Sequence, residues 1–82
     1  MKLIMFTKPY CTYCVKLKDL LEKEGVSFEV LDIIANENWL HFLLEEGLKS
    51  VPQVYEECSD GSCRRVGDYS DIAADITLVK PL

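Results

Sequence analysis

Two cysteines, Cys11 and Cys14, stand where a strand pattern gives way to a helix pattern, and this junction limits the folds open to the chain. Residues 2–6 form a short apolar run typical of a buried strand, and residues 7–10, which include Pro9, are typical of a loop. Beyond the pair, apolar side chains recur at helical spacing up to residue 24. A Cys-x-x-Cys pair between a strand and a helix is typical of a redox site.

The rest of the chain predicts a regular alternation of strands and helices. Asn36 is the expected N-cap of a second helix, and Gly25 and Gly47 stand where the two helices should end. The prediction is an α/β fold of βαβαββα order, with a four-stranded mixed sheet flanked by three helices and its first two strands parallel. The expected strands are residues 2–6, 26–33, 51–57 and 63–67, and the expected helices are residues 12–24, 36 or 37 to 46, and about 70–76.

Length and composition favour one small domain covering residues 1–82. Domains of about 50 residues or more can fold alone, and the hydrophobic content of 49% is enough for a core. The net charge of −5 argues against a nucleic-acid partner, which needs clusters of Lys and Arg. No run approaches the roughly 18 apolar residues of a membrane span, and the first apolar run is too short for a signal-peptide core. We therefore expect a cytoplasmic monomer without nucleic-acid or membrane partners.

The position of Cys11 predicts a reactive thiol. A thiol attacks a disulfide as its thiolate, and a helix start stabilises an anion, so we expect the pKa of Cys11 to lie below the usual value of about 8.5. Lys8 adds a positive charge three residues earlier. Cys14 lies one helical turn further on, on the same face as Leu17 and Leu21. We therefore predict that Cys11 is the nucleophile and that Cys14 is a more buried, resolving thiol.

A structural disulfide or half of a zinc site would show the same Cys-x-x-Cys spacing. Zinc needs two further ligands at matching spacing. The remaining cysteines, Cys58 and Cys63, belong to the predicted hairpin, whose turn we expect on the far side of the sheet from Cys11. We therefore favour redox chemistry and predict no metal site.

Cys58 and Cys63 flank Asp60-Gly61, a pair that favours a two-residue hairpin turn. That turn would place the two cysteines directly opposite each other, with α-carbons about 4.5 Å apart. Disulfides span α-carbon distances of about 4.4 to 6.8 Å, so a cross-strand disulfide and a pair of free thiols are both open. The same register places acidic residues opposite basic ones, namely Glu57 with Arg64 and Glu56 with Arg65.

Three segments resemble the motifs of the glutaredoxin family. In chain order they are Lys8-x-x-Cys11-x-Tyr13-Cys14, Ser50-Val51-Pro52-Gln53-Val54-Tyr55 and Val66-Gly67-Asp68-Tyr69-Ser70-Asp71-Ile72. The resemblance implies a thioredoxin-like fold with a cis-proline, Pro52, facing the dithiol. It also implies an enzyme, a thiol–disulfide oxidoreductase that reduces protein disulfides and glutathione mixed disulfides through Cys11 and Cys14.

The resemblance further implies a site for glutathione as co-substrate, with no covalently bound cofactor. By analogy, Lys8 would meet the glycine carboxylate, Tyr13 would flank the tripeptide, and Pro52 would form a wall of the site. The Val51 backbone would pair with the cysteinyl residue as an added strand does. The γ-glutamyl end would meet the start of the last helix, at Tyr69, Ser70 and Asp71. The implied partners are glutathione and disulfide-containing proteins, with ribonucleotide reductase among the candidates.

Three residues depart from the family pattern. Thr12 replaces the usual proline of the dithiol motif, and Lys49 stands beside a position that is often basic. Asp68 replaces the second glycine of the last motif. Its carboxylate either lines the γ-glutamyl pocket, where it would weaken binding, or caps the final helix.

Two other functions are compatible with these residues. One is an electron donor to ribonucleotide reductase that thioredoxin reductase recycles, and the other is an iron–sulfur cluster carrier ligated by Cys11 and glutathione in a dimer. Lys8 and Ser70-Asp71 favour glutathione as the reductant. The second cysteine, Cys14, favours dithiol chemistry over cluster binding.

Overall fold

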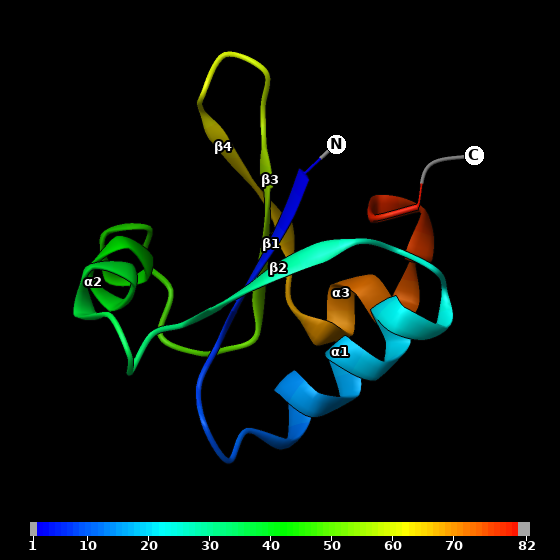
Figure 1. Ribbon diagram of the computed structural model, residues 1–82, viewed down its shortest axis with the longest axis horizontal. Helices are drawn as coiled ribbons and strands as arrows, with labels where there is room; N and C mark the ends of the chain where they lie inside the picture. The colour runs from blue at the N-terminus through cyan, green and yellow to red at the C-terminus, as the bar shows by residue number, and fades with distance from the viewer. Residues whose placement is uncertain (1, 81–82) are drawn as a thin grey trace.

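The computed structural model describes residues 2–80, which form four strands, three α-helices and a short 3-10 helix (Figure 1). The strands form one sheet in the order β2-β1-β3-β4. β1 runs parallel to β2 and antiparallel to β3, which in turn runs antiparallel to β4. The predicted mixed sheet with three helices is therefore confirmed. The elements are β1 (Lys2–Thr7), α1 (Thr12–Lys23), β2 (Phe28–Asp32), α2 (Glu37–Glu45), β3 (Gln53–Glu57), β4 (Cys63–Gly67), α3 (Tyr69–Ala74) and the 3-10 helix η1 (Ile76–Leu78).

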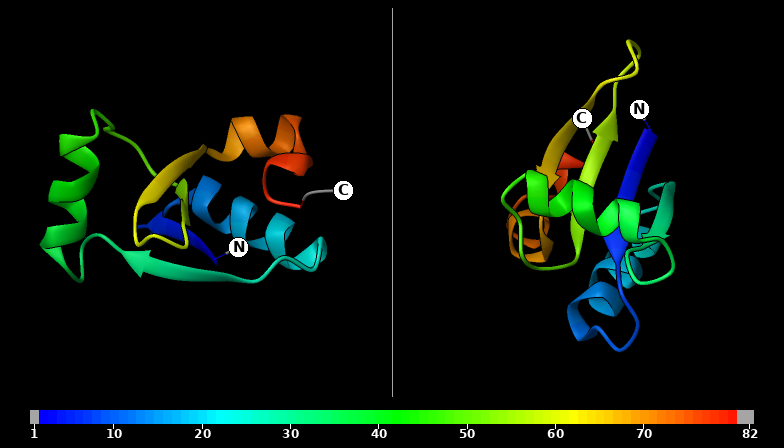
Figure 2. Two further views of the ribbon diagram at one scale, coloured as in Figure 1. Left: turned by 90° about the horizontal axis from the view of Figure 1, so that it is seen from above. Right: turned by 90° about the vertical axis from the view of Figure 1, so that its left-hand side faces the viewer.

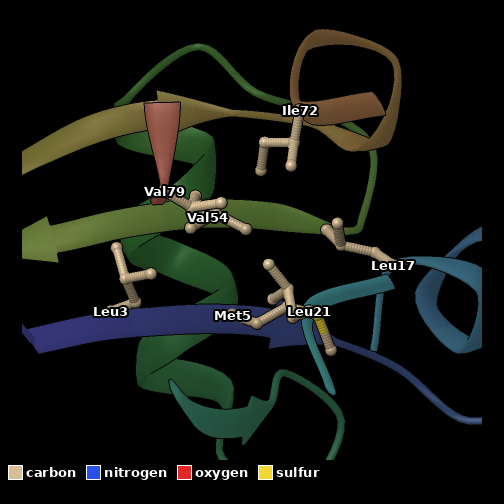
Figure 3. Close-up of a cluster of buried hydrophobic side chains, with 7 residues drawn as sticks. All are labelled: Leu3, Met5, Leu17, Leu21, Val54, Ile72 and Val79. Carbon is tan, nitrogen blue, oxygen red and sulfur yellow. The ribbon is translucent and has the colours of Figure 1, made fainter. Parts of the chain in front are cut away.

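Helices cover both faces of the sheet, with α1 and α3 on one face and α2 on the other (Figure 2). Successive side chains of a strand point to opposite faces, so Met5 and Phe6 of β1 belong to different cores. The core below α2 buries Phe6, Ile33, Leu43 and Tyr55. The core below α1 and α3 buries Leu3, Met5, Leu17, Leu21, Val54, Ile72 and Val79 (Figure 3).

The ends of the helices follow local capping rules. Asn36 caps α2 by accepting a hydrogen bond from the Asn38 N–H at 3.0 Å, as predicted. The last helix, predicted near residues 70–76, is present as α3 but ends earlier, at Ala74, and η1 follows it. Asp75, between the two, is extended (φ −147°), and its carboxylate accepts a hydrogen bond from the Thr77 N–H at 3.1 Å. Such local bonds compete with the helix and explain why α3 stops there.

The hairpin between β3 and β4 differs from the prediction by one residue. The Gly61 N–H donates to the Cys58 carbonyl at 3.0 Å, and the Cys58 N–H donates to the Ser62 carbonyl at 2.7 Å. The loop therefore holds three residues, with Gly61 in the left-handed region (φ 87°) that such loops require. The Asp60 carboxylate stabilises this loop by accepting a hydrogen bond from the Ser62 N–H at 2.9 Å.

The changed register alters every predicted pair of the hairpin. Glu57 lies opposite Cys63, and Glu56 lies opposite Arg64, with which it forms an ion pair. Cys58 and Cys63 are not facing partners, and both are free thiols in this structure.

Candidate active site

Cys11 lies at the N-cap of α1, directly after the loop that leaves β1. Tyr10 turns the chain there with a positive φ of 60° and a fully exposed side chain. The Sγ atom of Cys11 accepts a hydrogen bond from the Cys14 N–H at 3.2 Å, as the oxygen of a capping Ser or Asp does in other helices. The sulfur therefore lies where amide hydrogens and the positive helix end stabilise an anion.

The two sulfurs of the dithiol differ in exposure. Cys11 and Cys14 form a disulfide with α-carbons 5.2 Å apart. Cys14 is only 4% exposed and shares the buried face of α1 with Leu17 and Leu21, whereas Cys11 is partly exposed. Cys11 is thus the more accessible sulfur, as its place at the helix start predicted.

The segment before β3 forms the opposite wall of the site. The Val51–Pro52 peptide bond is cis, in agreement with the expectation, and the Val51 carbonyl oxygen lies 3.7 Å from the Cys11 Sγ. Gln53, which is 2% exposed, donates from its Nε2 to the Ser50 carbonyl at 3.1 Å. This buried amide holds the segment in place, a role that the sequence did not predict.

A cavity of about 190 Å³ lies between this wall, α1 and the start of α3. The Tyr13 ring, from α1, lies 5.4 Å from the Tyr69 ring, and the Lys16 Nζ lies 5.0 Å from the centre of the Tyr13 ring. Aromatic and cationic contacts of this kind fix the rim between the two helices. The lining residues are Tyr13, Ser50, Val51, Pro52, Asp68, Tyr69 and Ser70.

The start of α3 is built from a reciprocal pair of hydrogen bonds. The Asp68 Oδ1 accepts from the Asp71 N–H at 3.0 Å, and the Asp71 Oδ2 accepts from the Asp68 N–H at 3.0 Å. Gly67 precedes this pair with a φ of 155°, and a β-carbon there would come within 2.7 Å of the Asp71 Cβ. Asp68 therefore caps α3, one of the two predicted alternatives, and its side chain also lines the cavity. That this cavity takes the γ-glutamyl group stays a prediction.

Arg65 connects this cap to the wall of the site. Its Nη2 lies 3.5 Å from the Asp71 Oδ2, and its Nε donates to the Gln53 Oε1 at 3.1 Å. The pKa of Asp71 is lowered, mainly because the Asp68 N–H donates to its carboxylate and further because of the positive charge of Arg65. A polar residue inside a predicted buried strand was the signal for Gln53. Its pairing with Arg65 depends on the register shift within the β3–β4 pair and could not be foreseen.

Lys8 lies on the other side of Val51, in a second cavity of about 70 Å³. Lys49, to which the sequence gave no role, lines the same cavity because the chain returns to the site after α2. The other lining residues are Ile33, Leu40, Leu43, Leu44, Leu48, Ser50 and Val51.

Six of the seven residues predicted to contact glutathione line two adjoining cavities. Lys8 and Val51 line the smaller one. Asp71 holds the cap of α3 and is not among the residues that line either cavity in the described chain. The larger cavity gathers Tyr13, Val51, Pro52, Tyr69 and Ser70.

The tip of the β3–β4 hairpin lies at the opposite end of the sheet from the start of α1, which places Cys58 and Cys63 away from the Cys11–Cys14 pair (Figure 1). Within residues 2–80, no group of three or more His, Cys, Asp or Glu side chains is arranged to hold a metal ion. Across the same part of the chain, no helix combines the length and the apolar character that crossing a membrane requires.

A disulfide at a helix start, next to a cis-proline and combined with a four-stranded mixed sheet, places this chain in the class of thioredoxin-like redox proteins. Residues 3–58 match the family described as Glutaredoxin, which is more than half of the chain. The chain therefore belongs to the glutaredoxin family, whose members are thiol–disulfide oxidoreductases.

Individual relatives agree with this assignment. Glutaredoxin-C1 of Arabidopsis thaliana is 34% identical over 68 residues, which cover 77% of this chain and 54% of the relative. Glutaredoxin 1 of Rickettsia prowazekii is 36% identical over 56 residues, which cover 65% of this chain and 59% of the relative. The chain spans about half the length of these two curated relatives.

Solved structures share the fold over nearly the whole chain. The solution structure of glutaredoxin from Brucella melitensis matches with a TM-score of 0.72 at 26% identity, covering 100% of this chain and 92% of that one. The crystal structure of a buckwheat glutaredoxin–glutathione complex matches with a TM-score of 0.73 at 19% identity, covering 95% of this chain and 76% of that one. The predicted thioredoxin-like fold is confirmed.

Proposed function

We propose that this chain is a glutathione-dependent thiol–disulfide oxidoreductase in which Cys11 is the nucleophile and Cys14 the resolving thiol. The observation that carries the proposal is the arrangement of the two sulfurs. Cys11 is partly exposed and its Sγ accepts the Cys14 N–H at 3.2 Å, while Cys14 is 4% exposed behind it. One sulfur is therefore accessible and stabilised as a thiolate, and the other reacts only when a mixed disulfide forms beside it.

Reduction of a protein disulfide takes two exchange steps. The Cys11 thiolate attacks one sulfur of the substrate, which forms a mixed disulfide and releases the first substrate thiolate. Cys14 loses its proton and attacks the Cys11 Sγ, which releases the second substrate thiolate and leaves the Cys11–Cys14 disulfide. Two electrons pass from the dithiol to the substrate, and the disulfide form seen here is the oxidised product.

Glutathione returns the two electrons. Its thiolate attacks the Cys11 Sγ, which frees Cys14 and leaves glutathione bound to Cys11 as a mixed disulfide. A second glutathione thiolate attacks the bound glutathione sulfur, so that glutathione disulfide leaves and the Cys11 thiolate is regenerated. To reduce a glutathione mixed disulfide, the Cys11 thiolate attacks the glutathione sulfur, which releases the substrate thiolate and leaves glutathione bound to Cys11. The second glutathione then regenerates the Cys11 thiolate as above, so Cys14 is dispensable for this reaction.

The larger cavity is where we place the glutathione backbone and its γ-glutamyl end. Val51 precedes β3, which begins at Gln53, so an extended peptide can pair with its backbone as an added strand. The Tyr13 ring would flank the tripeptide, and Tyr69 and Ser70 line the end of the cavity that the γ-glutamyl group would occupy. A buckwheat glutaredoxin of the same fold was solved as a complex with glutathione, which supports glutathione as the ligand.

The glycine carboxylate would lie on the other side of Val51. Lys8 and Lys49 line the smaller cavity there, and both side chains are exposed. Two cations beside an apolar hollow suit a carboxylate at the end of a peptide, because the charge is attracted without being buried.

The test is reduction of a glutathione mixed disulfide, with either glutathione and glutathione reductase or thioredoxin reductase as the recycling system. We expect turnover with the glutathione system. Cys11→Ser should abolish it, whereas Cys14→Ser should keep turnover of the glutathione mixed disulfide and lose reduction of protein disulfides.

Two results would contradict the proposal in different ways. An active Cys11→Ser variant with an inactive Cys14→Ser variant would reverse the assignment of roles. Recycling by thioredoxin reductase alone would retain the oxidoreductase activity and refute the dependence on glutathione.

A further inference from the structure

The β3–β4 hairpin contains two irregularities whose effects cancel. Near the base, Val54 lies opposite Gly67, but the next residue of β3, Tyr55, lies opposite Arg65, so Val66 is an extra residue on β4. At the tip, the loop has three residues and Gly61 forms the bulge that closes it. The segment between these two bulges is therefore shifted by one residue relative to the base of the hairpin.

Removing both bulges gives a second, regular register. Continuing the pairing of Val54 with Gly67 outward would leave Asp60-Gly61 as a two-residue turn, for which Asp-Gly is a preferred sequence. Gly61 already has the positive φ that this turn needs. Cys58 and Cys63 would then lie directly opposite each other in a non-hydrogen-bonded pair, at an α-carbon separation that a disulfide spans.

The side chains of the hairpin suit both registers. Glu56 pairs with Arg64 in the observed register, and in the shifted one Glu56 would face Arg65 while Glu57 would face Arg64. Opposite charges thus remain paired after the shift. Strands whose side chains do not favour one register strongly are prone to slip, and the outer part of β4 is exposed from Cys63 to Arg65.

We infer that Cys58 and Cys63 are a second redox-active dithiol, which closes to a cross-strand disulfide when the hairpin shifts its register by one residue. The oxidant is a small-molecule disulfide such as glutathione disulfide. One cysteine thiolate attacks it, forming a mixed disulfide and releasing one glutathione thiol, and the other cysteine attacks that mixed disulfide and releases the second. The two cysteines lose two electrons and two protons, and one external disulfide becomes two thiols.

The shift also changes the contacts of Arg65, in the middle of β4. A slip of one residue turns the side chains of β4 between the two bulges to the opposite face of the sheet, while Gly67 stays opposite Val54. Arg65 would leave its contacts with the Gln53 Oε1 and the Asp71 Oδ2, which join the hairpin to the wall of the active site and to the cap of α3. Closing the hairpin disulfide would therefore remove one support of the cavity beside Cys11.

The test uses the full chain with Cys11→Ser and Cys14→Ser, so that the hairpin thiols react alone. The protein is equilibrated with glutathione and glutathione disulfide, quenched with acid and analysed by mass spectrometry, and its register is followed by NMR. We expect the chain to lose two hydrogen atoms without gaining glutathione. We also expect a close contact between the α-hydrogens of Cys58 and Cys63 to replace the one between Glu57 and Cys63.

Two further substitutions in this background bias the register in opposite directions. Asp60→Asn favours the two-residue turn, because Asn-Gly is its strongest sequence, and should raise the fraction of disulfide. Ser59→Pro fits the observed three-residue loop but removes the N–H that would donate across the two-residue turn, so it should cause loss of the disulfide.

Any of three results would overturn the inference. They are glutathione attached to the hairpin cysteines without ring closure, a disulfide that forms while the contact between Glu57 and Cys63 persists, and a Ser59→Pro variant that oxidises as readily as its parent. Circular dichroism checks that Ser59→Pro is folded, and the Asp60→Asn arm decides the matter if it is not.

Discussion

Asp68 offers a sharp test of the proposed glutathione site, because its carboxylate has two separable roles. One oxygen caps α3 by accepting the Asp71 N–H at 3.0 Å, and its negative charge lies at the wall of the larger cavity. Asp68→Asn keeps an oxygen for the cap and removes the charge. Asp68→Ala removes both and serves as the matched control.

The expected magnitudes follow from the partial exposure of the side chain. A charge contact at such a position contributes about 0.2 to 1 kcal/mol, so loss of repulsion should lower the KM for glutathione by roughly one-and-a-half- to fivefold in both variants. The gain should shrink with added salt, because exposed charges are screened over about 10 Å at 0.1 M. Stability should separate the two variants: loss of the cap in Asp68→Ala costs about 1 kcal/mol, or about 4–8 °C in Tm for a domain of this size.

The assay measures the KM for glutathione at low and high salt, together with a thermal melt of each variant. An unchanged KM at low salt in both variants would remove Asp68 from the glutathione site. A drop in Tm for Asp68→Asn as large as that for Asp68→Ala would show that the cap does not act through the retained oxygen.

Three further predictions follow from features of the fold and site. Gly67→Ala should lower stability by about 1–3 kcal/mol, measured by denaturant unfolding, because its positive φ and the nearby Asp71 leave no room for a β-carbon. Burial, reinforced by a hydrogen bond to Glu46, raises the pKa of Tyr55 to about 12, so stability should fall as pH rises from 10 to 12, by up to about 3 kcal/mol, and Tyr55→Phe should lack this loss. Lys8→Glu should raise both the KM for glutathione and the pKa of Cys11, followed by thiolate absorbance against pH; an unchanged pKa would mean that the helix start alone stabilises the thiolate.

The sequence predicted the order of the elements because most of their boundaries carry local signals. Asn36 and Gly47 mark the ends of α2, and Cys11 stands at the start of α1. Local signals failed where a residue competes with the helix, as Asp75 does at the end of α3. They also failed at Asp60-Gly61, since this pair suits both a two-residue turn and a three-residue loop, and the observed loop goes with a bulge further along the same hairpin.

The candidate site was predictable in its cysteines and in the residues that share a motif with them. Contacts between site residues that are far apart in the sequence were not predictable. Gln53 and Arg65 meet across β3 and β4, and Lys49 reaches the cavity of Lys8 only after the chain has returned from α2. Such pairings depend on register and on loop paths, which sequence spacing does not encode.

The interior is divided into two hydrophobic cores, and each core supports a different half of the site. Cys14 is buried beside Leu17, next to the core below α1. The smaller cavity, at Lys8 and Lys49, is instead lined by side chains of α2 and of the segments next to it. The sheet lies between these two layers, so repacking one need not disturb the other. Randomising Leu40, Leu44 and Leu48 should therefore change the proposed site of the glycine carboxylate more than the packing behind Cys14, and changes at Leu17 should do the reverse.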